Sequence, residues 1–571
     1  MSDGDNSSNQ QYLGHICQCL SRISTVRNDR VFTIFGDRRK TGLEFVENVC
    51  KLANGLAELG IQRGDVIAIA ALNSDLYLEW LLAIAFVGGI SAPLNYRWNF
   101  EEAKSAMEVV NPVMLVVDES CHTWYTQLQH NRTDSIKWHV FIGDRLPPSS
   151  FDRRDVICSE NLKKPSEKSL SMFDYCWAPD GIALICFTSG TTGKPKGVAI
   201  SHTSLIVQSL AKIAIVGYGE DDVYLHTAPL CHIGGISSGL TMLMVGACHV
   251  LIPKFETLTA LKAIEQHNVS TFIAVPTMMV DLISTIRKRS EEDGVRWRGG
   301  ESMKKILNGG GGLSTELVRD ITTNIFPTAK LLSAYGMTET CSSLTFMTLY
   351  DPAKGSSGNL LPGVESTPRE GFRVGKPAPH VELRVIREGS SSPVGRILTR
   401  GPHVMVKYWG NQIGKQDQGW IDTGDIGWMD SSGELWLVGR MKDRIKSGGE
   451  NVFPEEVETV LSRHPGISGI LVVGIPDPRL SEMVIACVQV RENWRWADQN
   501  SDFSQEKEKP TISPEILQMY CKEMKLSRFK IPKVFLLWRK PFPLTSTGKL
   551  RRQEVRQEAI SRLQLMLPSY L

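Results

Sequence analysis

Short apolar runs alternate with longer amphipathic stretches along this chain. The apolar runs predict buried β-strands at 65–70, 113–117, 181–187, 304–308 and 382–386. Stretches 76–87 and 204–216 show the apolar spacing of helices instead. Strands that alternate with helices are typical of an α/β fold built in layers.

The character of the sequence changes after Arg440. From Met441 onward the chain reads as a compact segment of its own, with both helical and strand-like runs. We therefore expect a multi-domain α/β protein, with a large N-terminal domain of layered α/β subdomains over 1–441 and a small α+β C-terminal domain over 442–571. The Gly-, Pro- and Ser-rich stretches 351–370 and 493–514 predict surface loops.

Charge and cysteine usage narrow the class of protein. The formal net charge is only +2, so the protein lacks the strong positive electrostatic field that would attract nucleic acid or an anionic membrane. Twelve cysteines without a CxxC pair or zinc spacing indicate reduced thiols in an intracellular compartment. The N-terminus lacks a secretory signal pattern, and the least charged stretch, 224–253, is too polar to span a bilayer. We expect a soluble intracellular protein without a nucleic acid partner, and the oligomeric state stays open.

The strongest chemical signal is the stretch 188–197, TSGTTGKPKG, which follows an apolar strand. Its small residues expose backbone N–H groups and hydroxyls, and its two lysines add positive charge, which suits a polyphosphate. It is not a Walker A loop, because only two residues separate Gly190 from Gly193. A flexible linker is the plain alternative, but linkers do not usually join a buried strand to another apolar run.

Four further pieces fit a nucleotide. The glycine run 308–312 leaves room for a flat ring against the backbone. The stretch 333–339, SAYGMTE, offers an aromatic face, hydroxyls and a carboxylate suited to Mg²⁺. Asp425 can accept hydrogen bonds from ribose hydroxyls, and Arg440 adds a cation. Each piece alone is also typical of a turn or a helix start. The nucleotide site is therefore predicted from the number of pieces and their order in the chain.

These motifs, continued by 439–458 and by PLTSTGKL at 543–550, resemble the ordered core motifs of the adenylate-forming family of acyl-CoA synthetases, luciferases and adenylation domains. The resemblance covers about Gly42 to Arg552. It implies that a carboxylate attacks Mg·ATP to give an acyl-adenylate and pyrophosphate, and that a thiol then displaces AMP. ATP, Mg²⁺ and CoA are the implied cofactors and substrates, with a small-molecule carboxylate.

The resemblance also implies a role for each matching residue. The ATP or AMP site would comprise Thr188, Ser189, Gly190, Thr191, Thr192, Gly193, Lys196, Gly309, Gly310, Gly311, Tyr335, Gly336, Asp425 and Arg440. Thr338 and Glu339 would act at the α-phosphate, with Glu339 as the Mg²⁺ ligand, and Lys549 would reach the transferring groups during adenylation.

In this family the small domain is mobile and swings between the two half-reactions. The matching hinge here is Lys442, and Lys446, Gly448 and Gly449 would face CoA after the swing. The chain carries no carrier-domain motif after Lys549, so free CoA is the expected acceptor, although luciferase chemistry stays open.

The acyl pocket is expected around a motif histidine, His232, which we count among the catalytic residues, and around small hydroxyl residues. These are Ser237, Ser238, Ser342 and Ser343. Such a pocket favours a short polar or aromatic acid over a long fatty chain. Several stretches, 217–226 and 341–347 among them, resemble the plant ligases that act on 2-succinylbenzoate in phylloquinone synthesis, found in chloroplast and peroxisome.

Three alternatives stay open. The enzyme can be a CoA ligase for another aromatic or short acid. Residues 235–239, GISSG, match the G-x-S-x-G elbow of a serine hydrolase with Ser237 as nucleophile, although that elbow requires a strand just before it. A silent acyl or nucleotide sensor is the third, against which the intact Lys196, Glu339 and Lys549 argue. The C-terminal Ser-Tyr-Leu matches the peroxisomal signal only in part.

Overall fold

The structure is a computed structural model that describes most of the chain. The described residues are 14–130, 135–146, 154–164, 170–189, 195–293, 297, 299–354, 371–387, 392–410, 417–447, 450–477, 480–497, 509–524, 526, 528–544 and 550–566. The chain divides into two compact units. The first comprises Met1–Glu365, Val374–Glu382 and Thr399–Ile421, and the second comprises Ser366–Arg373, Leu383–Leu398 and Asp422–Leu571.

The first unit contains an eight-stranded sheet whose central strands are parallel. In spatial order its strands are β19 (Lys407–Tyr408), β9 (Pro195–Ser201), β8 (Ile182–Ser189), β4 (Ile90–Pro93), β3 (Val66–Ala70), β5 (Met114–Val117), β6 (Trp138–Phe141) and β7 (Val156–Cys158). β3 is buried at every position, as expected for a parallel strand that is covered on both faces.

A second sheet of the same unit is parallel from β14 through β1, with antiparallel strands at its sides. Its order is β15 (Thr345–Tyr350), β14 (Lys330–Tyr335), β13 (Lys305–Asn308), β12 (Thr271–Ala274), β10 (Val223–His226), β11 (Cys248–Leu251), β1 (Val31–Phe35) and β2 (Arg38–Thr41). The ends of β13 and β14 therefore lie side by side, which positions the segments that follow them.

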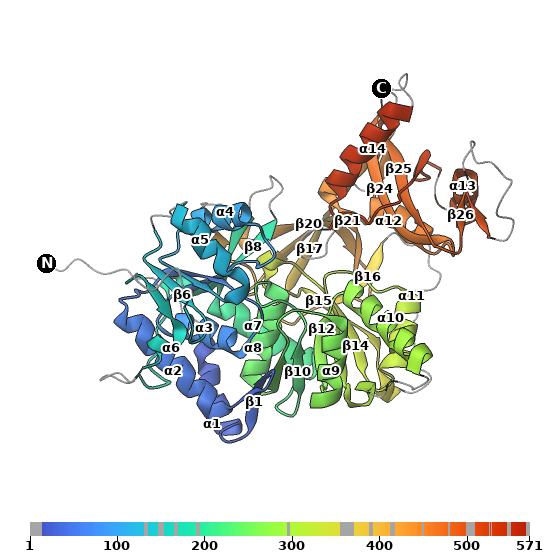
Figure 1. The fold of residues 1–571 in the computed structure, drawn as a ribbon. Helices are drawn as coiled ribbons and strands as arrows, with labels where there is room; N and C mark the ends of the chain where they lie inside the picture. The colour runs from blue at the N-terminus through green and yellow to red at the C-terminus, as the bar shows by residue number, and fades with distance from the viewer. Residues whose placement is uncertain are drawn as a thin grey trace. The chain divides into compact units, whose positions relative to one another are not determined.

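Helices cover both faces of these sheets, so the first unit is layered (Figure 1). They are α1 (Cys19–Val26), α2 (Gly42–Glu58), α3 (Asp75–Phe86), α4 (Phe100–Val110), α5 (His122–His130), α6 (Ser159–Leu162), α7 (His202–Val216), α8 (Ile233–Val245), α9 (Thr257–His267), α10 (Pro276–Asp293) and α11 (Thr315–Asp320). One core cluster joins α3, α7 and α8 to strands of both sheets. α4 and α5 pack on the eight-stranded sheet in a second cluster, and α9, α10 and α11 pack on the other sheet in a third.

The second unit contains most of strands β17 (Glu382–Arg387), β18 (Gly395–Arg400), β20 (Ile421–Met429) and β21 (Leu435–Arg440), hydrogen-bonded in that order. Strand β16 (Phe372–Pro377) contains residues of both units. A separate sheet follows. It comprises β22 (Ile445–Ser447), β23 (Glu450–Val452), β24 (Ile467–Asp477), β25 (Ser481–Val490) and β28 (Val534–Leu537). Alternate residues of β24 point to opposite faces, so Val472 packs with α12 (Pro454–Ser462) and α13 (Pro514–Glu523), and Leu471 packs with α14 (Arg552–Met566).

The α/β prediction is confirmed, and the predicted strands and helices each coincide with an observed element within one or two residues. The stretch 493–514 departs from a plain loop, because it contains the two-residue strands β26 (Arg495–Trp496) and β27 (Thr511–Ile512). Ile512 is fully buried and Trp496 packs against the same cluster, which holds these ends together. Residues 355–370 of the other predicted loop lie outside the described residues. The hinge near Lys442 stays a prediction.

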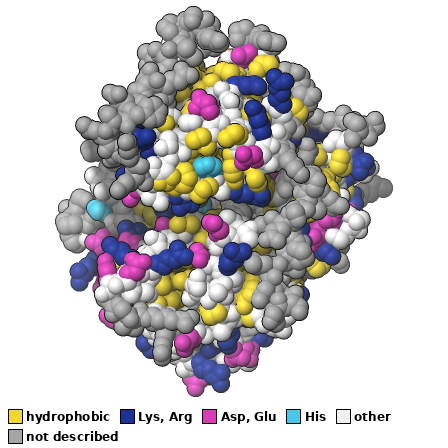
Figure 2. All heavy atoms as spheres, turned by 90° about the vertical axis from the view of Figure 1, so that its right-hand side faces the viewer, with side chains coloured by type: hydrophobic (Ala, Val, Ile, Leu, Met, Phe, Trp, Pro, Cys, Tyr) yellow, Lys and Arg dark blue, Asp and Glu magenta, His cyan; other side chains and the backbone are white. Residues whose placement is uncertain are grey.

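The distribution of surface charge and the state of the cysteines agree with the near-neutral net charge and the absence of paired cysteine motifs. Figure 2 shows Lys and Arg side chains interspersed with Asp and Glu side chains on the face that it presents. All twelve cysteines are free. Within the described ranges, each helix is too short or too polar to cross a bilayer.

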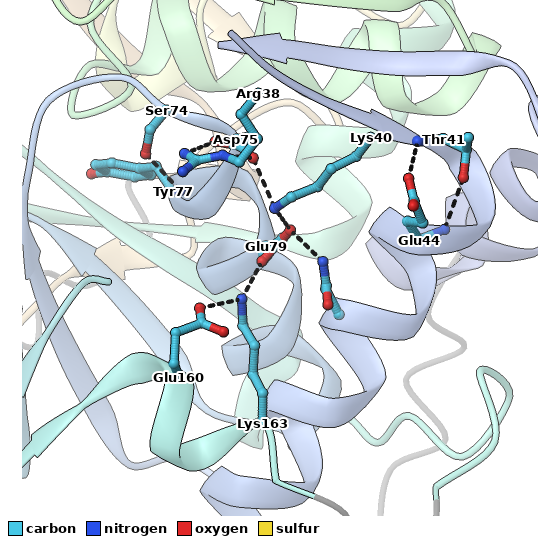
Figure 3. Close-up of polar contacts among 11 residues, drawn as sticks. Arg38, Lys40, Thr41, Glu44, Ser74, Asp75, Tyr77, Glu79, Glu160 and Lys163 are labelled. Atoms are coloured by element: carbon cyan, nitrogen blue, oxygen red, sulfur yellow. Dashed lines mark hydrogen bonds and ion pairs between the residues drawn. The ribbon is translucent and has the colours of Figure 1, made fainter. Parts of the chain in front are cut away.

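A buried ion network ties β2, α3 and α6 together (Figure 3). Lys40 Nζ lies 2.8 Å from a carboxylate oxygen of Asp75 and also pairs with Glu79. Lys163 Nζ lies 3.0 Å from Glu79 and 3.0 Å from Glu160. Burial alone would raise the pKa of Asp75, but hydrogen bonds and charges from Arg38 and Lys40 outweigh burial and lower it. The carboxylate of Glu79 is fully buried between two lysines, so its charge holds the network together.

Glu79→Gln should lower the free energy of unfolding by about 3 to 5 kcal/mol, because two largely buried ammonium groups lose their shared counter-charge. Thermal unfolding followed by circular dichroism measures the effect. Glu160→Gln is the matched control, since the Glu160 side chain is 46% exposed and its pair with Lys163 should contribute about 1 kcal/mol or less. Equal losses in the two variants would contradict the importance of the buried carboxylate.

Candidate active site

The predicted phosphate loop connects two antiparallel strands, β8 and β9. Thr188 is opposite Lys196, and Ser189 is opposite Pro195, so the loop leaves and returns at one point of the sheet. Thr188 is half-buried and Lys196 is exposed. Gly190, Thr191, Thr192 and Gly193, together with the side chain of Ser189, lie outside the described residues. The two ends of the loop are therefore placed, and its charged end faces solvent.

Strand β19 brings a carboxylate to this loop. Tyr408 pairs with Val198 of β9, and its hydroxyl donates to Glu339 Oε1 at 2.8 Å. Lys196 Nζ lies 5.5 Å from the centroid of the Tyr408 ring, within cation–π range. Burial and the charge of Glu339 raise the pKa of Tyr408, so the phenol stays protonated and donates. A lysine, a phenol and a carboxylate are thus assembled from segments far apart in the sequence.

Tyr408 was not identified from the sequence. It stands outside every motif, and only the register between β9 and β19 brings its hydroxyl to Glu339. An aromatic residue in a short strand gives no signal of such a role in a single sequence.

Glu339 lies on a tight loop that follows β14. The turn η7 (Thr338–Thr340) is closed by a hydrogen bond from the Thr340 hydroxyl to the Met337 carbonyl oxygen, at 3.0 Å. The backbone N–H of Met405 donates to the Glu339 carbonyl oxygen at 2.9 Å. Cys341 and Ser342 follow with positive φ angles of 52° and 98°, which non-glycine residues rarely adopt. The loop therefore has one defined conformation that presents Thr338 and Glu339 together.

Gly336 permits this loop to fold back on itself, because a Cβ atom at this position would overlap the carbonyl oxygen of Ser342. Gly336→Ala should lower the activity expected from the sequence motifs about 100-fold, since displacement of residues at a reaction centre by about 1 Å has that effect. ATP–pyrophosphate exchange measures it. Gly219→Ala is the control, because no atom lies within 4 Å of a Cβ at Gly219. Full activity of Gly336→Ala would show that the close approach is unimportant.

The candidate adenine site lies at the carboxyl ends of β13 and β14. Asn308 ends β13, and its side-chain amide donates to the Gly311 carbonyl oxygen at 2.7 Å, which fixes the glycine run. Gly310 has a φ of 74°, a conformation that glycine adopts without strain. Tyr335 ends the neighbouring strand β14 and is half-buried. A glycine run and an aromatic ring at neighbouring strand ends suit a purine, because ligands of α/β sheets bind there.

The candidate ribose residues belong to the second unit. Asp425 and Arg440 are opposite each other on β20 and β21, and their side chains are 3.4 Å apart. Asp425 is 9% exposed, and its backbone N–H donates to the Thr423 hydroxyl at 3.1 Å. Lys442 lies in the turn η11 (Met441–Asp443) directly after β21. Gly448, Gly449, Lys549 and the side chain of Lys446 lie outside the described residues, and the backbone of Lys446 belongs to β22.

The predicted acyl residues surround the N-terminal half of α8. His232 is the residue that precedes α8 and is half-buried. Ser237 and Ser238 are fully buried, and Ser342 Oγ lies 3.4 Å from Ser343 Oγ. Lys212 was not identified from the sequence, and its ammonium donates to Ser237 Oγ at 2.6 Å and Ser238 Oγ at 3.1 Å.

The serine hydrolase alternative is wrong. A nucleophile elbow places its serine on the sharp turn between a strand and a helix. Ser237 instead lies in the second turn of α8, and its fully buried hydroxyl contacts the Lys212 ammonium.

The donor set of the site fits Mg²⁺ held together with ATP. Mg²⁺ prefers oxygen ligands and is usually bound by one or two carboxylates plus substrate phosphates. Glu339 supplies such a carboxylate beside the phosphate loop. Among the residues that the structure describes, no group of three or more His, Cys, Asp and Glu side chains forms a metal site by itself.

The sequence pattern of a known family spans most of this chain. The AMP-binding enzyme pattern matches residues 20–409, and the pattern of the AMP-binding enzyme C-terminal domain matches 456–549. The chain belongs to the AMP-binding enzyme family. The predicted family, and its large N-terminal and small C-terminal parts, are confirmed.

This AMP-binding enzyme has relatives of nearly equal length. It is 52% identical over 564 residues to "2-succinylbenzoate–CoA ligase, chloroplastic/peroxisomal" of Arabidopsis thaliana, covering 97% of this chain and 99% of the relative. It resembles the o-succinylbenzoate CoA synthetase of Bacillus subtilis in complex with an acyl-adenylate intermediate, with 27% identity, a TM-score of 0.73 and coverage of 94% and 97%. The same Bacillus enzyme in complex with ATP and magnesium ion gives 26% identity, a TM-score of 0.73 and coverage of 94% and 98%.

Proposed function

We propose that this AMP-binding enzyme is an AMP-forming acid–CoA ligase that converts 2-succinylbenzoate, ATP and CoA into 2-succinylbenzoyl-CoA, AMP and pyrophosphate. The observation that carries the proposal is 52% identity to a plant ligase of that name over 97% of this chain. The reaction would serve phylloquinone synthesis. A Bacillus enzyme of similar fold that holds the acyl-adenylate intermediate supports the two-step course.

In the first step an oxygen of the aliphatic carboxylate attacks the α-phosphorus of Mg·ATP. The bond from that phosphorus to the pyrophosphate oxygen breaks, and pyrophosphate leaves. In the second step the CoA thiolate attacks the acyl carbon, and AMP leaves with the electron pair. Both steps build negative charge on oxygen atoms, so positioned cations and backbone N–H groups supply most of the catalysis.

We assign the first step to the residues around the phosphate loop. Thr188, Lys196 and the loop between them hold the phosphates, and Glu339 holds Mg²⁺ with Thr338 at the α-phosphate. Tyr408 positions Glu339 through the 2.8 Å hydrogen bond. Mg²⁺ would screen the phosphate charges and orient the α-phosphate for attack. His232 borders the acyl site at the start of α8.

We assign the remaining groups on the family resemblance and on their local structure. The glycines at 309–311 and the ring of Tyr335 bind adenine, and Asp425 and Arg440 bind ribose. Lys549 reaches the transferring groups in the first step. Rotation about Lys442 would then remove Lys549 and bring the segment from Lys446 to Gly449 to CoA.

A panel of carboxylates tests the proposal. 2-Succinylbenzoate, 4-coumarate, benzoate, malonate and octanoate are each supplied with Mg·ATP and CoA, and pyrophosphate and thioester are both followed. We expect both products with 2-succinylbenzoate and little with the others. Turnover of another acid alone would leave an acid–CoA ligase of different substrate. Pyrophosphate without thioester would overturn CoA as the acceptor.

The compartment is a further part of the proposal. The Arabidopsis relative carries the description chloroplastic/peroxisomal, and we propose the same compartments for this enzyme. Immunodetection of the untagged protein in purified organelles of its source tests this. A signal confined to the cytosol would overturn it.

A further inference from the structure

Lys212 is a fully buried lysine that contacts three of the predicted acyl-pocket serines. It lies on α7, and neither a carboxylate nor another anion contacts its ammonium among the described residues. The nearby Cys341 thiol and Tyr224 phenol do not serve as counter-ions. Burial raises the pKa of Cys341 to about 12 and also raises the pKa of Tyr224, so both groups are neutral near pH 7.

A buried ammonium group without a counter-ion destabilises the folded protein. A buried charge without a partner destabilises the fold by several kcal/mol, and a methionine of similar length would fill the same space. Burial lowers the pKa of Lys212 to about 8, so at neutral pH the group still carries its charge for most of the time. Two largely buried lysine side chains of this unit, Lys40 and Lys163, each have carboxylate partners. Among the described residues, the ammonium of Lys212 therefore lacks a counter-charge, which an anionic ligand would supply.

The groups around Lys212 suit a carboxylate. Its three N–H donors point to Ser237 at 2.6 Å, Ser238 at 3.1 Å and Ser342 at 3.5 Å. The third contact is at the limit of a hydrogen bond, so a carboxylate oxygen next to Ser342 can take that donor. A serine hydroxyl that accepts from the ammonium keeps its own proton to donate to the same anion. Of the three serines around Lys212, Ser342 is half-buried, and it lies in the loop that follows β14.

Helix α7 also fixes the loop against Lys212. Gln208, one turn before Lys212, donates to the Thr340 carbonyl oxygen at 3.1 Å and to the Ser343 carbonyl oxygen. Glu339 is three residues before Ser342, a span of at most about 10 Å even when extended. One small acid can therefore reach from Lys212 to the reaction centre around Glu339.

We propose that Lys212, assisted by Ser237, Ser238 and Ser342, binds the aromatic carboxylate of 2-succinylbenzoate, so that only the aliphatic carboxylate is left to react. This assignment rests on the proposed function. It makes Lys212 the residue that selects a dicarboxylate with one carboxylate on the ring.

The proposal is tested by measuring the unmodified enzyme and the Lys212→Met variant with two substrates each. The second substrate is 4-oxo-4-phenylbutanoate, which keeps the reacting chain and lacks the ring carboxylate. ATP–pyrophosphate exchange gives kcat/KM for both acids without CoA. The unmodified enzyme should prefer 2-succinylbenzoate by about 100-fold or more, and Lys212→Met should lose that preference through a fall with 2-succinylbenzoate alone. Lys288→Met, at an exposed lysine of α10, is the matched control and should keep the preference.

The possible outcomes distinguish the proposed role of Lys212 from the proposed ligase function. An equal fall with both acids, or no change in preference, would overturn the role of Lys212 and leave the ligase function intact. Failure of the unmodified enzyme to activate 2-succinylbenzoate would overturn the proposed function, and the assignment of Lys212 with it. If Lys212→Met does not fold, Ser342→Ala decides instead. It should lower kcat/KM about 10-fold with 2-succinylbenzoate and leave the other acid unchanged, and equal effects on the two acids would count against the proposal.

The pH profile gives a readout that a structural role would not produce. The free enzyme binds the ring carboxylate only with Lys212 protonated, so the preference for 2-succinylbenzoate should fall as pH rises through about 8. The neighbouring Cys341 and Tyr224 stay neutral over this range. Lys212→Met should show no such fall in its preference, and a parallel fall in that variant would contradict the assignment.

Discussion

Lys549→Ala should abolish most of the adenylation activity, with ATP–pyrophosphate exchange falling about 1000-fold, while the second half-reaction continues. The motif at 543–550 places Lys549 at the family position that is expected to reach the transferring carboxylate and phosphate, and the C-terminal family match extends to this residue. Charge would develop on both groups as the acyl–phosphate bond forms, and we propose that the Lys549 ammonium stabilises that charge. We propose that the lysine does not act in the second step, so thioester formation from supplied 2-succinylbenzoyl-adenylate should stay within about twofold of the normal rate.

Lys533→Ala is the control, because Lys533 is an exposed lysine of the same unit. It should leave both half-reactions unchanged. Equal losses in the two half-reactions of Lys549→Ala would show that Lys549 supports the fold or CoA binding, and full pyrophosphate exchange would remove it from the reaction.

Glu339→Gln should lower pyrophosphate exchange about 100- to 1000-fold and raise the Mg²⁺ concentration required for half-maximal rate. The amide keeps the shape of the side chain and can still accept the hydrogen bond from Tyr408, so the loop should stay in place. The loss would then report the carboxylate charge that we propose holds Mg²⁺ beside the phosphates. Exchange measured across a range of Mg²⁺ concentrations gives both effects.

Tyr408→Phe separates positioning from charge. It removes the 2.8 Å hydrogen bond and leaves the carboxylate, so we expect a loss of about 10-fold with an unchanged requirement for Mg²⁺. Glu301→Gln, at an exposed position of the same unit, should have no effect. If Glu339→Gln retained the normal rate and Mg²⁺ requirement, the metal would be held elsewhere.

Much of the fold follows from local sequence pattern. Runs such as 65–70 predict β3 because a parallel strand that is covered on both faces is apolar at successive positions. The phosphate loop, the glycine run at 308–312 and the TE pair at 338–339 are also visible in sequence, because each needs particular residue types at fixed short spacing. Family membership follows from the same motifs in order.

Other features depend on contacts between distant segments, which the sequence by itself does not contain. Tyr408 reaches Glu339 only through the pairing of β9 with β19. Lys212 and Ser342 are 130 residues apart and meet because α7 packs against the loop that follows β14. In sequence Lys212 is one lysine in an amphipathic helix, and such lysines are usually exposed. The sequence thus determined the family, the layers and the nucleotide motifs. Tertiary packing decided which side chains meet in the proposed acyl site, because burial and strand register arise only when the whole chain folds.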